Sequence, residues 1–206
     1  MDAEHAEALV ELVAPLLARG GRVIVGITGP PGAGKSTLAE VLIRTTNGVP
    51  AVTVPMDGFH LSNQELARLG LADRKGAPET FDGFGFLHLL RRLRAGGELV
   101  YAPIFQREIE EAIGSAIPVP AEVRLVVVEG NYLLLPTGAW AQARPLFDLV
   151  VYLDVPAEVR IPRLLRRARE GGRDEAAAQD WVYRNDEANA ALIEASSARA
   201  DAVLGP

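Results

Sequence analysis

Residues 22–37 read RVIVGITGPPGAGKST, an apolar run followed by a glycine-rich turn, a lysine and two hydroxyl residues. Within it, Gly29–Ser36 matches G-x-x-x-x-G-K-[ST], the pattern of a phosphate-binding loop (P-loop, or Walker A motif). The apolar run predicts a buried strand over 22–27, and the residues after the loop predict a helix over 35–45. This strand–loop–helix context is the one the motif requires. The sequence therefore predicts a site for a nucleoside triphosphate.

The loop offers backbone and side-chain contacts to a triphosphate. Its glycines let successive backbone N–H groups turn toward phosphate oxygens, and the following helix adds the positive end of its dipole. Lys35 is predicted to reach the β- and γ-phosphates, and the Ser36 hydroxyl to bind Mg²⁺. The residues predicted to bind the nucleotide are Gly29, Pro30, Pro31, Gly32, Ala33, Gly34, Lys35, Ser36 and Thr37.

Length and composition are those of an ordinary globular protein. The chain has 206 residues, 49% of them hydrophobic and 23% charged, which predicts one domain over 1–206. It has no cysteine, which excludes a disulfide framework and a thiolate metal site. A net charge of −6 argues against nucleic acid as the partner. With no apolar run near the ~20 residues of a membrane span and no basic start of a secretory signal, we expect a cytoplasmic protein without a membrane partner.

Short apolar strands alternate with helices along the chain. Strands are expected over 22–27, 51–57, 123–130 and 148–154, with a last edge strand at 201–204. Helices are expected over 3–18, 35–45, 84–95, 156–170 and 174–195, while 71–82 reads as a loop and 99–121 as irregular with room for short strands. The alternation predicts a three-layer α/β fold with a mainly parallel central sheet. In such sheets the ligand binds at the carboxyl ends of the strands.

Two acidic residues stand at predicted strand ends. Asp57 follows the second strand and could accept, or orient, the proton of an attacking hydroxyl. Glu129 closes the strand at 123–130 and could hold a Mg²⁺-bound water or a substrate hydroxyl. The structural alternatives are an Asp-Gly turn for the first and a hydrogen-bond acceptor at a strand end for the second.

Arginines are concentrated after the strand at 148–154. The six are Arg160, Arg163, Arg166, Arg167, Arg169 and Arg173, and they predict a lid over about 160–175 that closes on the triphosphate. Arg163 and Arg167 are four residues apart and share a helix face, so they are the preferred catalytic pair. The alternative is a solvated helix face.

Two further candidates lie in polar surroundings. His60, three residues after Asp57, could line the site or serve only the core. Lys75 is one of two lysines in the chain and lies in a Gly- and Pro-containing segment that reads as a functional loop or as plain surface.

No Asn-Lys-x-Asp segment for reading guanine is present, and the apolar run before Glu129 does not end in Asp-Glu. A small-molecule kinase is therefore favoured over a GTPase or a motor ATPase.

Several motifs occur together in a fixed order. They are GPPGAGKST, PMDGFHL, RKGAPETFD, Y-x-P-x-F at 101–105 and VVVEGNYLLL, followed by the arginine-rich segment. This set, over about 22–204, resembles the superfamily of uridine kinase, phosphoribulokinase and bacterial pantothenate kinase. The resemblance implies an ATP- and Mg²⁺-dependent enzyme of P-loop fold that phosphorylates a hydroxyl of a small metabolite. The acceptor could be a nucleoside such as uridine, or pantothenate- or sugar-like.

The resemblance also implies roles for single residues. Asp57 matches the catalytic base, and Lys35 and Ser36 keep their phosphate and metal roles. Glu129 matches the acid after the central strand, which implies metal and substrate contacts. Arg107 and Asn131 fall on the substrate side, as do His60 and Lys75. Members of the family commonly form oligomers, so a homodimer is the partner that the resemblance allows.

Two other functions stay open on the sequence. The chain could be a nucleotide-binding regulatory protein that lacks transfer chemistry. It could also be a dephospho-cofactor or nucleotide kinase, which phosphorylates an existing phosphate. Asp57 separates the first of these from a kinase of hydroxyls, because a switch has no use for a base at that position.

Overall fold

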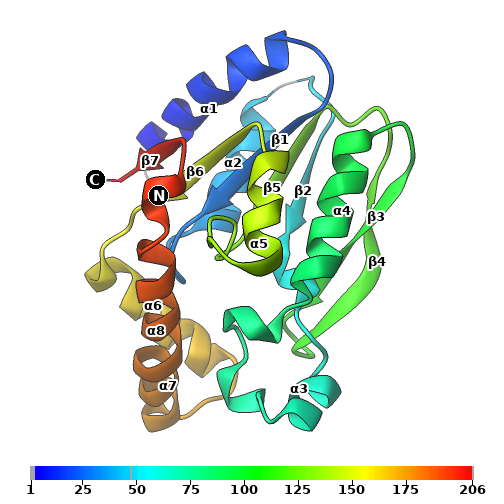
Figure 1. Ribbon diagram of the computed structural model, residues 1–206. Coiled ribbons are helices and arrows are strands. Elements are labelled where there is room, and N and C mark those ends of the chain that lie inside the picture. The colour runs from blue at the N-terminus through cyan, green and yellow to red at the C-terminus, as the bar shows by residue number, and fades with distance from the viewer. Residues whose placement is uncertain (1–2, 47, 206) are drawn as a thin grey trace.

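The centre of the molecule is a five-stranded parallel sheet (Figure 1), described here from a computed structural model for residues 3–46 and 48–205. Its strands are β1 (Val23–Thr28), β2 (Ala51–Pro55), β5 (Leu125–Glu129), β6 (Leu149–Leu153) and β7 (Ala202–Leu204). They lie in the order β2-β5-β1-β6-β7, so β1 is central and β7 forms an edge. The α/β fold and the last edge strand are confirmed.

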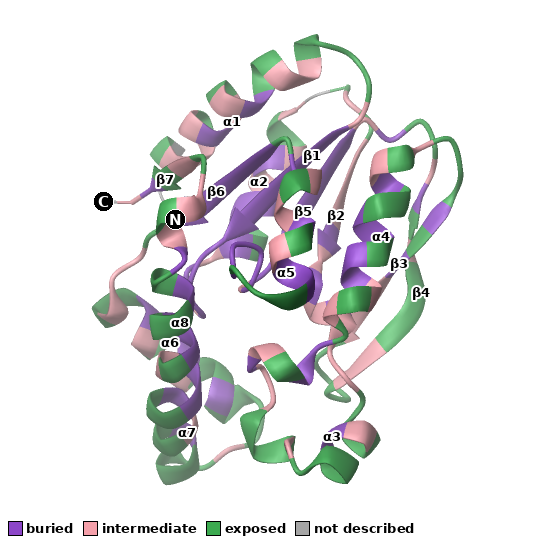
Figure 2. Ribbon diagram, viewed as in Figure 1, coloured by how far each residue is buried: buried purple, intermediate pink, exposed green. Residues whose placement is uncertain are grey.

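Helices cover both faces of this sheet. α1 (Ala3–Ala18) and α2 (Lys35–Thr45) pack on one face, and α4 (Gly83–Ala95) and α5 (Gly138–Ala143) on the other (Figure 1). Alternate strand residues enter the two cores: Val25 faces α1 and α2, whereas Ile24 faces α4 and α5. Every residue of the central strands is therefore buried, as Figure 2 shows, and this explains their unbroken apolar sequences.

The segment expected to be irregular at 99–121 is a long antiparallel hairpin. β3 (Val100–Gln106) pairs with β4 (Glu111–Val119) in a separate two-stranded sheet. Prolines argued against strands in this segment, but a ribbon of two edge strands tolerates them. The pairing shifts register between Ala102 and Ile104, on either side of Pro103. The short helix α5 was also not predicted.

The second strand is shorter than expected. β2 ends at Pro55, and Asp57 lies in the 3₁₀ turn Met56–Phe59 that follows it. Gly58 brings this turn against the hairpin, because a Cβ at that position would come within 2.5 Å of the Pro103 carbonyl oxygen. The turn thus fixes Asp57 beside both the sheet and the hairpin.

The C-terminal helices depart from the expected continuous helix over 174–195. α6 (Ala157–Glu170) is followed by α7 (Glu175–Trp181) and α8 (Glu187–Glu194). A π-helical turn, Val182–Asp186, separates α7 from α8. The expected loop at 71–82 contains two 3₁₀ turns and follows α3 (Asn63–Leu69). In the described ranges no helix is long and apolar enough to cross a membrane.

Arg160 joins the P-loop to these helices. Its side chain, only 1% exposed, donates from Nη1 to the carbonyl oxygen of Pro31 at 3.2 Å and to Glu187 Oε1 at 2.8 Å. Nε donates to the Val155 carbonyl oxygen at 3.0 Å. A predicted member of the functional arginine set is therefore a buried structural residue.

We predict that Arg160→Leu destabilises the fold by about 3–5 kcal/mol, because it leaves a carboxylate and two carbonyls without their partner. Arg166→Leu, on the same helix but largely exposed, serves as the control and should change the free energy of unfolding by less than about 0.5 kcal/mol. Urea denaturation measures both. Equal effects of the two substitutions would contradict the structural role of Arg160.

Candidate active site

The P-loop, the turn at Met56–Phe59 and the end of β5 open into a cavity of about 1000 Å³. The hairpin turn and the helices α6 and α7 complete its wall. This is where ligands bind in open parallel sheets. Of the predicted site residues, the cavity is lined by Pro31, Gly32, Gly34, Lys35, Ser36, Thr37, Asp57, His60, Lys75, Arg107, Glu129, Asn131, Arg163 and Arg167. Gly29, Pro30 and Ala33 are predicted members that do not line it.

The P-loop is shaped by glycine and held by cations. Gly32 and Gly34 have φ of +79° and +97°, which favour glycine. A Cβ on Gly32 would lie 3.0 Å from the Arg160 carbonyl oxygen, so glycine also allows α6 to approach. Lys35 Nζ donates to the carbonyl oxygens of Gly29 at 2.9 Å and Pro30 at 3.1 Å. Arg163 Nη1 donates to the Gly32 carbonyl oxygen at 3.1 Å.

The Lys35 ammonium lies among acids in a buried position. Burial lowers its pKa to about 8, and the carboxylates of Glu129 and Asp57 oppose that shift. The side chain is consequently still mainly protonated at neutral pH. A buried cation beside the P-loop is the charge that β- and γ-phosphate oxygens require.

Ser36 and Glu129 form a pair of oxygen donors beneath the loop. Ser36 Oγ donates to Glu129 Oε1 at 3.2 Å. Burial first, and then the charge of Asp57, raises the pKa of Glu129 from 4.5 to about 7. A hydroxyl and a carboxylate suit Mg²⁺, which prefers oxygen ligands and is usually held by few protein groups plus phosphate and water. Residues 3–46 and 48–205 contain no cluster of three or more His, Asp or Glu side chains that could hold a metal ion.

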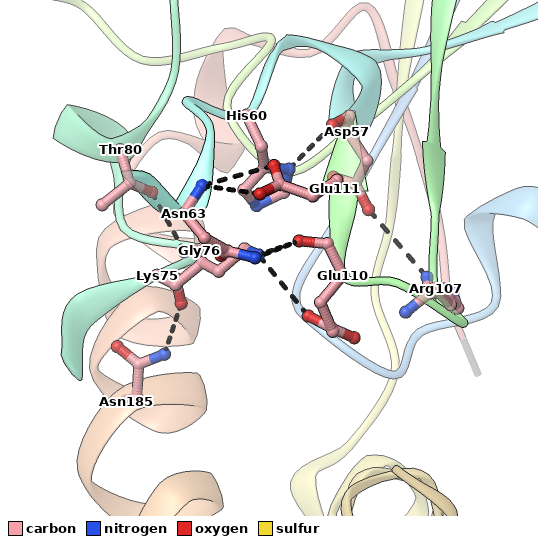
Figure 3. A network of polar contacts seen from close by, with 10 residues as sticks. All are labelled: Asp57, His60, Asn63, Lys75, Gly76, Thr80, Arg107, Glu110, Glu111 and Asn185. Atoms are coloured by element: carbon pink, nitrogen blue, oxygen red, sulfur yellow. Dashed lines mark hydrogen bonds and ion pairs between the residues drawn. The ribbon is translucent and has the colours of Figure 1, made fainter. Parts of the chain in front are cut away.

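Asp57 faces the cavity beside two basic side chains. Its Oδ2 lies 3.9 Å from Arg107 Nη2, and its backbone carbonyl contacts His60 Nδ1 at 2.7 Å (Figure 3). The His60 ring packs between Phe81 and Phe105, with ring centroids 4.0 and 4.7 Å away. Burial lowers the pKa of His60, so its imidazole is neutral at pH 7. This packing makes His60 a wall of the cavity and a support for the Asp57 turn.

Lys75 is tied to the hairpin. Its Nζ donates to Asn63 Oδ1 at 2.7 Å and to the Glu110 carbonyl oxygen at 2.5 Å (Figure 3). The Glu110 carboxylate lies 3.7 Å from the same nitrogen, and the ammonium sits over the Phe105 ring. Glu110, whose carbonyl oxygen accepts the hydrogen bond from Lys75, has φ of +52°. Lys75 therefore links the loop before α4 to the hairpin turn and is not a free cation.

The arginine-rich segment divides into three kinds of residue. Arg163, Arg166, Arg167 and Arg173 line the cavity, Arg160 is buried, and Arg169 pairs with Glu175 at 3.0 Å. Helical spacing predicted the shared face of Arg163 and Arg167 but could not separate the buried arginine from the others.

Several residues that line the cavity were not among the predicted site residues, and two of them are buried polar side chains. Asp186 and Asn189 line the cavity although they are only 8% and 6% exposed. Burial raises the pKa of Asp186 to about 6, against the opposing charges of Arg167 and Arg173. Their signal in the sequence is a cluster of polar side chains, beginning at Asn185, in an alanine-rich helix. The π-helical turn that directs Asp186 inward has no such signal.

The chain is similar in sequence and structure to several known proteins. The "Putative uridine kinase" of Schizosaccharomyces pombe is 34% identical over 214 residues, which cover 98% of this chain and 91% of that protein. The "Pantothenate kinase" of Levilactobacillus brevis is 33% identical over 64% of this chain and 44% of its own length. A "putative fructose transport system kinase" from Silicibacter sp. TM1040 has 40% identity and a TM-score of 0.84, over 95% of this chain and 98% of that one.

The family model described as "Phosphoribulokinase / Uridine kinase family" matches residues 24–205. That range runs from β1 to the end of β7 and includes the whole wall of the cavity. On the sequence, the fold and these matches together, the chain belongs to the phosphoribulokinase/uridine kinase family of P-loop kinases.

Proposed function

We propose that this protein is an ATP-dependent kinase that transfers the γ-phosphoryl group to a hydroxyl of a small metabolite. The observation that carries the proposal is the meeting of Lys35, Asp57 and the Ser36–Glu129 pair in one cavity at the strand ends. Phosphoryl transfer requires bound phosphates, a cation site and a carboxylate that can take the hydroxyl proton. The names of the relatives span nucleoside, pantothenate and sugar kinases, which supports a small hydroxylic acceptor.

In the proposed reaction the acceptor oxygen attacks the γ-phosphorus of ATP. A new O–P bond forms as the bond to the β-phosphate oxygen breaks, and ADP leaves. The hydroxyl proton passes to Asp57, whose carboxylate faces the cavity. Lys35, Arg163 and Arg167 stabilise the negative charge of the transferred group. We also propose that the arginines of about 160–175 act as a lid that closes on the phosphates.

Ser36 and Glu129 are the residues that would hold Mg²⁺. When bound, the ion would neutralise phosphate charge. Glu129 must be ionised for this role, whereas burial and the charge of Asp57 favour its protonated form. Metal binding should therefore release a proton near neutral pH.

We predict that Asp57→Asn lowers kcat by about 10²–10⁴-fold and leaves the binding of ATP nearly unchanged, because the amide cannot accept the proton. The assay is ADP release from ATP and Mg²⁺ with uridine, cytidine, pantothenate, ribulose 5-phosphate and fructose as acceptors. Lys35→Ala should abolish the acceptor-dependent signal.

Asp180→Asn provides the matched control, since Asp180 is an exposed partner of Arg184 outside the cavity. Normal turnover of Asp57→Asn would remove Asp57 from catalysis. Tight ATP binding without release that depends on any acceptor would favour the nucleotide-binding regulatory protein instead.

We predict that the nucleotide- and metal-free protein loses stability as pH rises from 5 to 8. The folded state holds the Glu129 proton up to about pH 7 and the unfolded chain only up to about 4.5, so folding takes up a proton between these values. Asp186 contributes with the same sign up to about pH 6. His60, whose pKa burial lowers from 6.5, opposes this trend below that value, and Lys35 acts with the opposite sign only above about pH 8.

Glu129→Gln should therefore flatten this dependence and be more stable than the wild type at pH 8, by on the order of 2 kcal/mol. Urea denaturation at pH 5, 6, 7 and 8 measures the slope. Glu40→Gln, on an exposed part of α2, should keep the wild-type slope. A slope in Glu129→Gln as steep as in the wild type would show that Glu129 is not the titrating group.

A further inference from the structure

The charges of the cavity are divided between its two sides. Lys35 and the four arginines Arg163, Arg166, Arg167 and Arg173 lie at the P-loop and on the lid segment, where, among the described residues, Glu170 is the one carboxylate that lines the cavity. On the other side, around the Asp57 turn and the hairpin, the carboxylates are Asp57, Glu108, Glu110 and Glu129, and the cations are Lys75 and Arg107. The first side suits a polyphosphate. The second, where the acceptor must bind for its hydroxyl to reach Asp57, is acidic.

Both cations of the acidic side already have carboxylate neighbours. Lys75 is held by the Glu110 carbonyl oxygen, the Glu110 carboxylate and Asn63 (Figure 3). Arg107 faces Asp57 across 3.9 Å (Figure 3). An anionic group on the acceptor would have to displace a carboxylate from one of them, while other carboxylates nearby repel it.

Two further polar side chains line the cavity outside these two sides, one in the π-helical turn next to Arg167 and Arg173 and one in α8. Asp186 and Asn189 line the cavity and are more than nine-tenths buried. Among residues 3–46 and 48–205, the structure gives neither side chain a hydrogen-bond partner. Asn189 lies by Gly76, since a Cβ on that glycine would be 4.0 Å from its amide nitrogen. A carboxylate accepts hydrogen bonds from hydroxyls, and an amide both accepts and donates them.

Given the proposed kinase function, we infer that the acceptor is an uncharged polyhydroxy compound, such as a free sugar or a nucleoside, whose hydroxyls bind to Asp186 and Asn189. Phosphorylated and carboxylated acceptors are excluded by the acidic side and by the engagement of Lys75 and Arg107. Asp57 receives the proton of one hydroxyl, and the remaining hydroxyls fix the orientation of the acceptor.

Matched pairs of acceptors that differ mainly in charge test this inference. The pairs are pantothenol and pantothenate, glycerol and glycerate, ribulose and ribulose 5-phosphate, and uridine and uridine monophosphate. Turnover is measured as acceptor-dependent ADP release. Binding is measured by calorimetry in the presence of Mg²⁺ and a non-hydrolysable ATP analogue. In the pair that the enzyme uses, the uncharged member should have a kcat/KM at least about tenfold higher.

The outcomes separate the two proposals. Preference for the anionic member overturns the acceptor class but leaves the kinase intact. Binding of the uncharged members without turnover supports the acceptor class and contradicts the kinase. If neither the uncharged nor the anionic members of the pairs bind, the proposed acceptor class is overturned.

Two substitutions test the inference directly. Glu108→Gln removes one negative charge from the acidic side, at the hairpin turn, and Asp186→Asn removes one from the π-helical turn, where the acceptor hydroxyls are proposed to bind. Each should reduce the preference for the uncharged member by about threefold or more, and Asp186→Asn should also raise the acceptor KM with little change in the KM for ATP.

Asp180→Asn removes a charge from the exposed part of α7 and should leave the ratio unchanged. A purely structural role would lower activity with both members of a pair alike. An unchanged ratio in both Asp186→Asn and Glu108→Gln would overturn the proposed contribution of these two carboxylates.

Discussion

The buried guanidinium of Arg160 is the interaction on which the arrangement of the site depends. A guanidinium has five N–H donors and no acceptor, so in a buried position it must keep acceptors around it. It finds them on three separate segments: Pro31 in the P-loop, Val155 before α6 and Glu187 in α8. The P-loop and the helices that bear the cavity arginines are thereby held at fixed positions relative to one another.

The same principle extends along the P-loop. The carbonyl oxygens of Gly29 and Pro30 accept from Lys35, that of Pro31 from Arg160 and that of Gly32 from Arg163. Exposed carbonyl oxygens would repel a phosphate, and here each is turned toward a cation. The loop is consequently prepared for an anion before one arrives, which is a form of electrostatic preorganisation.

The position of Glu129 in the site disfavours the ionised form of its own carboxyl group. Glu129 is buried and close to Asp57, and both effects favour its protonated form. Carboxyl groups with pKa values shifted in this way are common at functional sites, where they bind a ligand. The charge of a metal ion held by Ser36 and Glu129 would favour the ionised carboxylate, so the raised pKa of Glu129 is consistent with the proposed metal site.

The sequence predicted those parts of the molecule that depend on local patterns. The apolar strands, the P-loop with its following helix and the acidic residues near strand ends were found because a period or a motif marks each of them. The hairpin was missed because its prolines, acceptable in an isolated two-stranded ribbon, read as strand breakers. The separate roles of Arg160 and Lys75 depend on contacts with residues far along the chain, such as Pro31 and Glu110. No spacing rule contains that information.

The π-helical turn between α7 and α8 also constrains the length of the chain. Its wider turn accommodates a residue more than regular α-helical winding would. Deleting one residue there would let the two helices join in regular α-helical winding, but it would remove the widened turn that carries Asp186 to the cavity. In this stretch the number of residues is therefore under as much constraint as their identity, so that single deletions should be less tolerated here than substitutions.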